Sequence, residues 1–141
     1  MSTQAVAADI AGIAAIAATV TGVVGTSANV PETIPATPWA IVGNHHATFA
    51  AGANERIDYT FPVRFYVERV ASDAQTSTVI NGLIDAMMVA FRTGMTLGGI
   101  VDGLYITDWN SDLYAEVGGS RYQVLEANVH VIGRGAGDYT A

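Results

Sequence analysis

Histidines and carboxylates must carry any acid–base or metal chemistry in this chain, because it has no cysteine. The missing cysteine excludes thiol nucleophiles, thiolate zinc sites and redox pairs. His45 and His46 are adjacent, and adjacent residues of a strand point to opposite faces of the sheet. The two histidines therefore cannot coordinate the same metal ion. His130 fits an ordinary histidine on a half-exposed strand. We therefore expect no metal-binding residue among the histidines.

Asp108, Asp112 and Glu116 form a group of carboxylates around a predicted turn. Such a group resembles a Ca²⁺ site or an acid–base pair. The spacing is not that of an EF-hand, however, and acidic residues beside Asn and Ser are typical of a solvated turn. No serine stands near a histidine in a way that suggests a catalytic triad. These carboxylates are therefore expected to be turn residues in contact with solvent.

Two clusters of glycine resemble phosphate-binding loops. They are Gly98, Gly99 and Gly103, and then Gly133, Gly135 and Gly137. A phosphate loop needs a strand before it and a helix after it whose amino terminus faces the anion, and neither cluster precedes a predicted helix. We predict no catalytic, cofactor-binding or metal-binding residue, no cofactor and no enzymatic activity. One alternative of a different class stays open, a small α+β domain that binds a ligand or metal through the two adjacent histidines and the carboxylate turn.

Length and charge narrow the classes of protein further. The chain of 141 residues fits one domain, and thirteen acidic residues against six arginines give a net charge of −7. Such a charge repels nucleic acid and anionic lipid. Half of the residues are apolar, and apolar surface of that extent on a small soluble chain often ends in a subunit interface. The composition therefore favours an assembly role.

Residues 1–24 are predicted to form an N-terminal helix. No charged residue occurs from Ile10 to Pro31, a stretch long enough to suggest a membrane span. It is rich in Ala, Gly, Thr and Ser and has no flanking Lys or Arg before Arg56, so an amphipathic helix packed on the domain or on a neighbour fits better. Its apolar stripe consists of Val6, Ile10, Ile13, Ala17, Val20 and Val24.

A connector of residues 25–38, marked by three prolines, leads into the predicted sheet and its helix, residues 39–133. The first strand is expected over 39–49 and the second over 57–70. Pro62 interrupts the second strand, which indicates an edge strand, a bulge or the end of pairing on one side. Alternation in this strand predicts one core-facing set, Tyr59, Phe61, Val63, Phe65 and Val67.

The loop between these two strands is the predicted partner interface. It is polar and built from short side chains, and the tips of such hairpins often carry function. Its residues are Ala51, Gly52, Ala53, Asn54, Glu55 and Arg56.

A second amphipathic helix is predicted over residues 73–93. Its core stripe consists of Val79, Ile80, Leu83, Ile84, Met87 and Phe91. Gly82 inside this helix costs about 1 kcal/mol relative to Ala, so either another group approaches closely there or the cost is tolerated. Three strands follow in a meander, over residues 96–109, 113–117 and 122–133, and a C-terminal tail of residues 134–141 ends the chain.

These elements predict a single α+β domain. Its sheet is mainly antiparallel or mixed, with about five strands, and the two amphipathic helices pack on one face of it.

The layout of the whole chain resembles that of the tail terminator, or tail completion, family of phages with long non-contractile tails. The likeness rests on the N-terminal helix, the Pro-rich connector before Trp39, the hairpin with its aromatic second strand and the helix of residues 73–93. It also includes the run Met95-Thr96-Leu97-Gly98-Gly99-Ile100-Val101, and the closing strand in which Arg121-Tyr122-Gln123 leads into Val129-His130-Val131. The Ala-rich, uncharged first helix departs from the family.

The resemblance implies a ring-forming subunit, a homohexamer that caps the completed tail tube, stops its polymerisation and forms the head–tail joining surface. Its partners would be further copies of itself, the tail tube protein and the head-completion or stopper protein of the neck. Genomic DNA would only pass through the lumen. The resemblance further implies a structural virion protein of the tail–neck region, assembled in the host cytoplasm, without membrane contact and without catalytic residues. Another neck or head-completion ring subunit is the alternative within the same biology.

Overall fold

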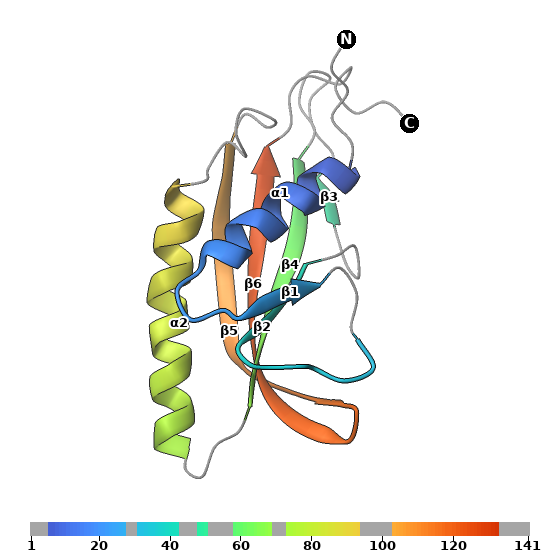
Figure 1. The fold of residues 1–141 in the computed structure, drawn as a ribbon. Helices are drawn as coiled ribbons and strands as arrows, with labels where there is room; N and C mark the ends of the chain where they lie inside the picture. The colour runs from blue at the N-terminus through green and yellow to red at the C-terminus, as the bar shows by residue number, and fades with distance from the viewer. Residues whose placement is uncertain are drawn as a thin grey trace.

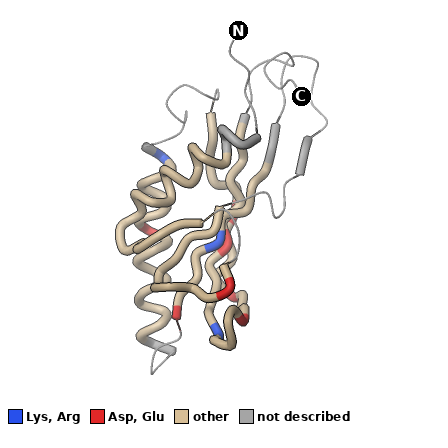
Figure 2. Tube along the Cα trace, turned by 45° about the vertical axis from the view of Figure 1, so that its right-hand side comes forward, with Lys and Arg blue, Asp and Glu red and all other residues tan. Residues whose placement is uncertain are grey.

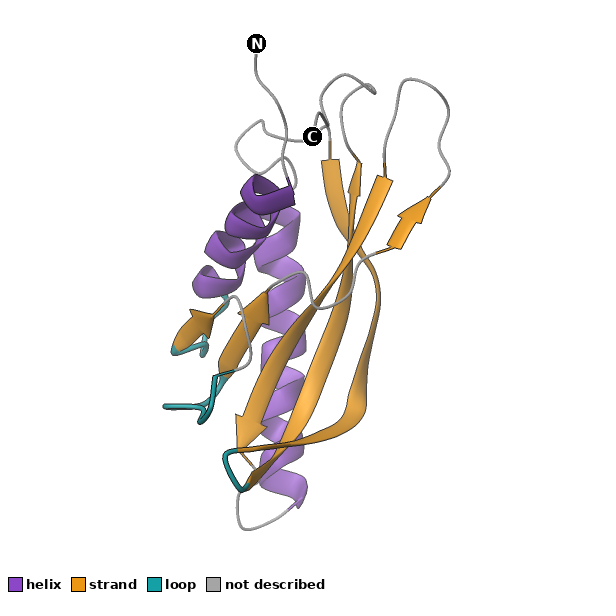
Figure 3. Ribbon diagram, turned by 90° about the vertical axis from the view of Figure 1, so that its right-hand side faces the viewer, coloured by secondary structure: helices purple, strands orange, loops and turns teal. Residues whose placement is uncertain are grey.

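Two helices cover one face of a mixed β-sheet in the computed structural model, which describes residues 6–27, 31–42, 48–50, 58–68, 73–93 and 103–132 (Figure 1). The helices are α1 (Val6–Thr19) and α2 (Asp73–Thr93). The strands are β1 (Gly25–Ser27), β2 (Trp39–Val42), β3 (Thr48–Ala50), β4 (Asp58–Glu68), β5 (Gly103–Val117) and β6 (Ser120–Ile132). Figure 3 shows both helices on the same side of the strands. The predicted α+β class and the placement of the helices are confirmed.

The sheet has six strands in the order β1-β2-β4-β6-β5, and β3 pairs with β4 outside this path. β1 and β2 are parallel, and every other described pair is antiparallel. β4 and β6 lie at the centre and pair over the whole length of β4. β5 and β1 are therefore the two outer strands, and each presents one edge that no described strand covers.

The strand predicted over residues 39–49 is two strands, β2 and β3, which pair with different parts of β4. Val42 pairs with Val63, whereas Thr48 pairs with Thr60. Pro62 therefore lies between the two stretches of β4 that pair with β2 and β3, so its missing N–H costs no hydrogen bond to either strand. On the other side of β4, Pro62 pairs with Asn128 of β6. The end of pairing on one side is confirmed, and the edge-strand alternative is wrong because β4 is central.

Two other strand predictions are corrected. The connector of residues 25–38 contains β1, a short strand parallel to β2. The strands predicted over 96–109 and 113–117 are one strand, β5, whose register against β6 shifts between Asn110 and Leu113. The predicted turn is thus a bulge. Its polar groups are satisfied locally, since the Asp112 N–H donates to Asn110 Oδ1 at 2.8 Å and Gln123 Nε2 donates to the Ser111 carbonyl at 2.9 Å.

The turn between β5 and β6 is a two-residue loop of Gly118 and Gly119, which have φ angles of 60° and 82°. Positive φ at both positions is the geometry of the tight hairpin turn that glycine favours. A Cβ at Gly118 would lie 2.6 Å from Thr33 Cγ2, so the connector packs directly against this turn. Only glycine fits there.

The main core lies between the helices and the sheet. The face of β4 predicted to be buried is confirmed at Phe61, Val63, Phe65 and Val67. The other buried members come from α1 and the turn after it, α2, β2, β5 and β6, and they include Ile13, Val20, Ile80, Leu83, Met87, Phe91, Leu104 and Leu125.

Two residues of the predicted helix stripes do not reach this core. Val24 is exposed because α1 ends at Thr19, so the helical spacing does not extend to it. Val79 is exposed because it neighbours Ile80, and successive residues of a helix point about 100° apart. Ile80 takes the core position.

A smaller apolar cluster lies on the opposite face of the sheet. It comprises Ile34, Ile41, Tyr66, Val117, Tyr122 and Val124. Ile34 belongs to the connector, which therefore packs against this face. Tyr66 alternates with the core-facing residues of β4, and the connector and the β5–β6 hairpin bury it on this opposite face.

Candidate assembly surface

The outward face of α1 carries no charge. Ala11, Ala15 and Ala18 are exposed there, and Ile13 and Ala17 of the same helix are buried against the sheet. Figure 2 shows no charged residue along the coloured part of this helix, whereas charge gathers on the central and lower strands. A surface helix normally presents charged or polar side chains to water. The outward face of α1 thus resembles an interface rather than a solvated surface.

One exposed stripe of α2 is also apolar and mostly small, although the exposed Thr78, Asn81 and Asp85 lie beside it. Val79 and Val89 are exposed to 40% and 65%. Gly82 and the half-buried Ala86 lie between them on the same side of the helix, and a Cβ added at Gly82 would have no atom of the described residues within 4 Å. No group of the described chain approaches Gly82, so the cost of glycine in this helix is tolerated within one subunit.

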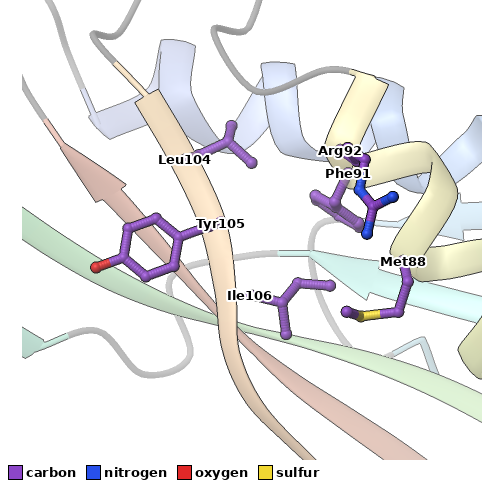
Figure 4. A pocket seen from close by; sticks show the side chains of 6 residues that line it. All are labelled: Met88, Phe91, Arg92, Leu104, Tyr105 and Ile106. Atoms are coloured by element: carbon purple, nitrogen blue, oxygen red, sulfur yellow. The ribbon is translucent and has the colours of Figure 1, made fainter.

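A groove of about 230 Å³ separates α2 from the outer strand β5 (Figure 4). Phe91 and Leu104 are buried at its base. Figure 4 shows Met88 and Ile106 pointing toward each other across the groove, while the ring of Tyr105 points to the other side of β5. The lining also includes Arg92, the one charged side chain among these residues. The groove is therefore an apolar depression with a cation beside it.

Exposed apolar side chains concentrate on these same elements. Seven large ones are exposed among the described residues, of which three lie on α2 and three on β5. They are Val79, Met88 and Val89, and then Tyr105, Trp109 and Tyr114. Aromatic and methionine side chains are enriched in protein interfaces. The side of the molecule formed by α2 and β5 is therefore the best candidate for an assembly surface, although the ring of Tyr105 lies on the other side of β5, against His130.

The open face of the sheet differs, because its polar side chains pair with one another across the strands. Thr60 Oγ1 lies 3.4 Å from His130 Nδ1, and Asn128 Nδ2 donates to both carboxylate oxygens of Asp108 at 3.1 Å. Arg64 Nε donates to Glu126 Oε2 at 2.7 Å. These pairs leave few polar groups that require a ligand. The open face is suited to contact with water.

The Arg64–Glu126 pair determines the electrostatics at the middle of this face. Partial burial lowers the pKa of Arg64, but the hydrogen bond to Glu126 and its charge, together with those of Tyr66, outweigh that effect and raise the pKa. The pair borders a second depression of about 380 Å³, whose lining includes Leu113, the residue at which β5 resumes its pairing with β6 after the bulge. The guanidinium is already neutralised there, so this depression shows no charge that calls for a ligand.

The structure describes only some of the residues singled out in the sequence. The predicted interface loop, Ala51, Gly52, Ala53, Asn54, Glu55 and Arg56, lies outside the described residues, as do His45, His46, Gly98, Gly99, Gly133, Gly135 and Gly137. Asp108, Asp112 and Glu116 are exposed along β5 and do not surround a turn. Gly103 begins that strand. Within the described ranges, no group of three metal-ligating side chains occurs.

The groove and the outward face of α2 were not predicted from the sequence. A signal was present, because Val79, Gly82, Ala86 and Val89 follow one another at steps of three or four and form a second uncharged stripe beside the core stripe. No sequence pattern indicated the groove, because its position depends on the pairing of β5 with β6.

Among the described helices, none is both long enough and apolar enough to cross a membrane. Comparison of the sequence with protein-family models and with curated proteins gave no match.

Proposed function

We propose that this protein is the tail terminator of a phage with a long flexible tail. As a structural virion protein of the neck, it caps the completed tail tube, stops its polymerisation and offers the surface to which the head-completion or stopper protein binds. The proposal starts from the resemblance of the whole layout to that family. The observation that carries it furthest is the concentration of exposed apolar side chains on α2 and the outer strand β5.

A subunit that assembles into a ring needs such a surface. Exposed apolar area that gathers on neighbouring elements often marks a contact with another protein, and a closed ring of identical subunits covers it on every copy. We propose a homohexamer, formed at least when the protein is bound to the tail.

The open face of the sheet fits the lumen of this ring. Its polar groups pair with one another, and the acidic Asp108 and Glu126 outnumber the basic Arg64. Together with the net charge of −7, they disfavour adhesion of the DNA phosphates. Genomic DNA then passes through the ring without being held.

The direct test is to add the purified protein to polymerising tail tube protein of the same phage and to image the tubes by electron microscopy. We expect rings at one end of each tube and arrested growth, whereas tubes without the protein continue to lengthen. Rings that bind the head portal instead of tube ends would indicate another neck subunit. A monomer that ignores tubes and binds Zn²⁺ or Ca²⁺ would favour a small ligand-binding domain.

A further inference from the structure

The groove between α2 and β5 lies beside an open edge of the sheet. β5 is the last strand in the order, so the main chain along its outer side pairs with no strand of the described residues. A strand edge of this kind is a template for pairing with another extended chain. Figure 4 shows that the lining of the groove comes from β5 and from α2 beside it. A strand added to this edge would therefore direct every second side chain toward the groove.

The groove is large enough for an apolar side chain. Its volume is about 230 Å³, whereas a protein cavity of about 150 Å³ already holds a benzene molecule. Phe91 and Leu104 are buried at its base, and Met88, which is 40% exposed, faces Ile106 across it (Figure 4). The methionine side chain is flexible and adapts to the groups that it contacts. The groove therefore offers an apolar side chain a buried base and an adjustable wall.

Arg92 supplies a positive charge beside this groove. Its side chain is exposed, and no described residue forms an ion pair with it. Asp85, the acid on the same side of α2, lies about two helical turns earlier, about 10 Å along the axis. The place of Arg92 in the last turn suits the helix dipole, but its guanidinium keeps donors for a further partner. A carboxylate on the added strand would pair with it.

Charge also decides which chain supplies the added strand. Within the described residues, a second copy offers two open edges, β1 and β5, and neither fits. β1 has no acidic residue for Arg92. Pairing of β5 with β5 would bring Asp108, Asp112 and Glu116 of both copies onto adjacent strands, where like charges repel. An extended segment of another protein, apolar apart from one carboxylate, fits both the groove and Arg92.

We infer that the groove binds an extended segment of a different protein. The segment pairs with the outer edge of β5, inserts an apolar side chain between Met88 and Ile106 and places a carboxylate against Arg92. This inference goes beyond the proposed function, because neither the arrest of tube growth nor the ring requires such a site. Val79 and Trp109 lie outside the lining of the groove, so they stay available for contacts between copies.

Charge reversal on both sides of the contact tests the carboxylate. The probes are fluorescein-labelled threonine heptapeptides that carry one leucine and, two positions before or after it, aspartate or lysine. Fluorescence anisotropy should show that the full chain prefers the better aspartate peptide over its lysine counterpart by about fivefold. Arg92→Glu should reverse this preference. Arg121→Glu is the matched control, because this arginine is also exposed but lies outside the lining of the groove, and it should leave the preference unchanged.

N-methylated peptides test the pairing with β5. Alternate N–H groups of an added strand face the edge, so the better aspartate peptide is made with either of the two alternating patterns of N-methyl groups. The pattern that blocks the inward N–H groups should abolish binding, and the other should preserve it. Replacement of the peptide leucine by serine should also abolish binding, because the groove then receives no apolar side chain.

Other outcomes overturn the inference. Absence of binding by every peptide would do so, as would a preference that Arg92→Glu leaves unchanged. Equal effects of the two N-methyl patterns would exclude strand addition. Peptide binding that disappears when the protein assembles by itself would show that a second copy covers the groove. Capping of tail tubes, measured on the same preparation, is independent of these results, so its failure would contradict the proposed function and leave the peptide site standing.

Discussion

The indole ring of Trp39 lies so close over the backbone of Gly25 that a Cβ there would be 2.1 Å from Cζ3 of the ring. The two residues are paired neighbours in the parallel strands β1 and β2, and Trp39 Nε1 donates to Ser27 Oγ at 3.1 Å. The contact anchors the segment that follows α1 to the edge of the sheet.

Substitution of Gly25 should therefore be costly. Gly25→Ala forces the indole or the strand to move, and overpacking of this kind typically costs about 1–3 kcal/mol of unfolding free energy. Gly82→Ala is the matched control, because no described atom lies within 4 Å of the added methyl group and Ala favours the helix by about 1 kcal/mol. Chemical denaturation should show opposite signs for the two variants. Equal effects would mean that the contact with Trp39 does not constrain the position.

Phe65 is the residue whose loss should damage the rigid part of the subunit most. It is fully buried at the centre of the main core, and truncation of a buried phenylalanine costs about 3–5 kcal/mol. Such a loss approaches the whole stability of an ordinary domain. Val89→Ala, at a position that is 65% exposed, should change the unfolding free energy by less than about 0.5 kcal/mol. Phage carrying Phe65→Ala should copy the null phenotype.

The ion pair on the open face should contribute only modestly to stability. The side chains of Arg64 and Glu126 are 35% and 23% exposed, so a double-mutant cycle with Arg64→Met and Glu126→Gln should give a coupling energy of about 0.5–1 kcal/mol that decreases with added salt. Because the pKa of Arg64 is raised, its contribution is present at all pH values below the ordinary arginine pKa and is lost only as pH rises through the raised value. The Arg64→Met penalty should not change as pH rises from neutral to mildly alkaline. A penalty that fades there would show that Arg64 loses its proton far earlier.

The connection of residues 51–57 joins two strands, β3 and β4, that are already paired. The predicted interface loop is expected to contact a partner or line the lumen rather than pack on the core, so deletion of Ala51 to Asn54 should leave the melting temperature nearly unchanged and weaken attachment of the protein to tails. Thermal melts and co-sedimentation with tails measure the two effects. A large fall in melting temperature would instead identify the loop as structural.

Much of the fold could be predicted because it depends on local patterns. The alternation of Phe61, Val63 and Phe65 defines β4, and the spacing of Ile80, Leu83 and Phe91 defines α2, without reference to distant residues. β1 has no such pattern, since Gly-Thr-Ser becomes a strand only when Trp39 packs against it. A contact between residues fourteen positions apart cannot be predicted from the local sequence pattern.

The same distinction separates the predicted and the missed parts of the candidate site. The excess of apolar residues predicted an interface, but its location depends on which side chains the sheet leaves uncovered. The apolar type of Val79 favours a core position, but Ile80 occupies that position instead. Asn110 and Asp112 are typical turn residues, so the local sequence predicts a turn at the bulge in β5. The pairing with β6 shows that the strand is continuous through this bulge.

The central claim is that this protein stops the growth of a tail tube, and the most direct measurement is the length of tails made by phage that lack it. A tube grows by adding identical rings to an exposed end, so growth should continue past the normal stop when no cap binds. Electron microscopy of infected-cell lysates should then show filled heads without tails beside separate tubes of variable, excessive length, and supply of the intact protein should restore uniform tails. Tails of normal length joined to heads in the absence of the protein would contradict the account.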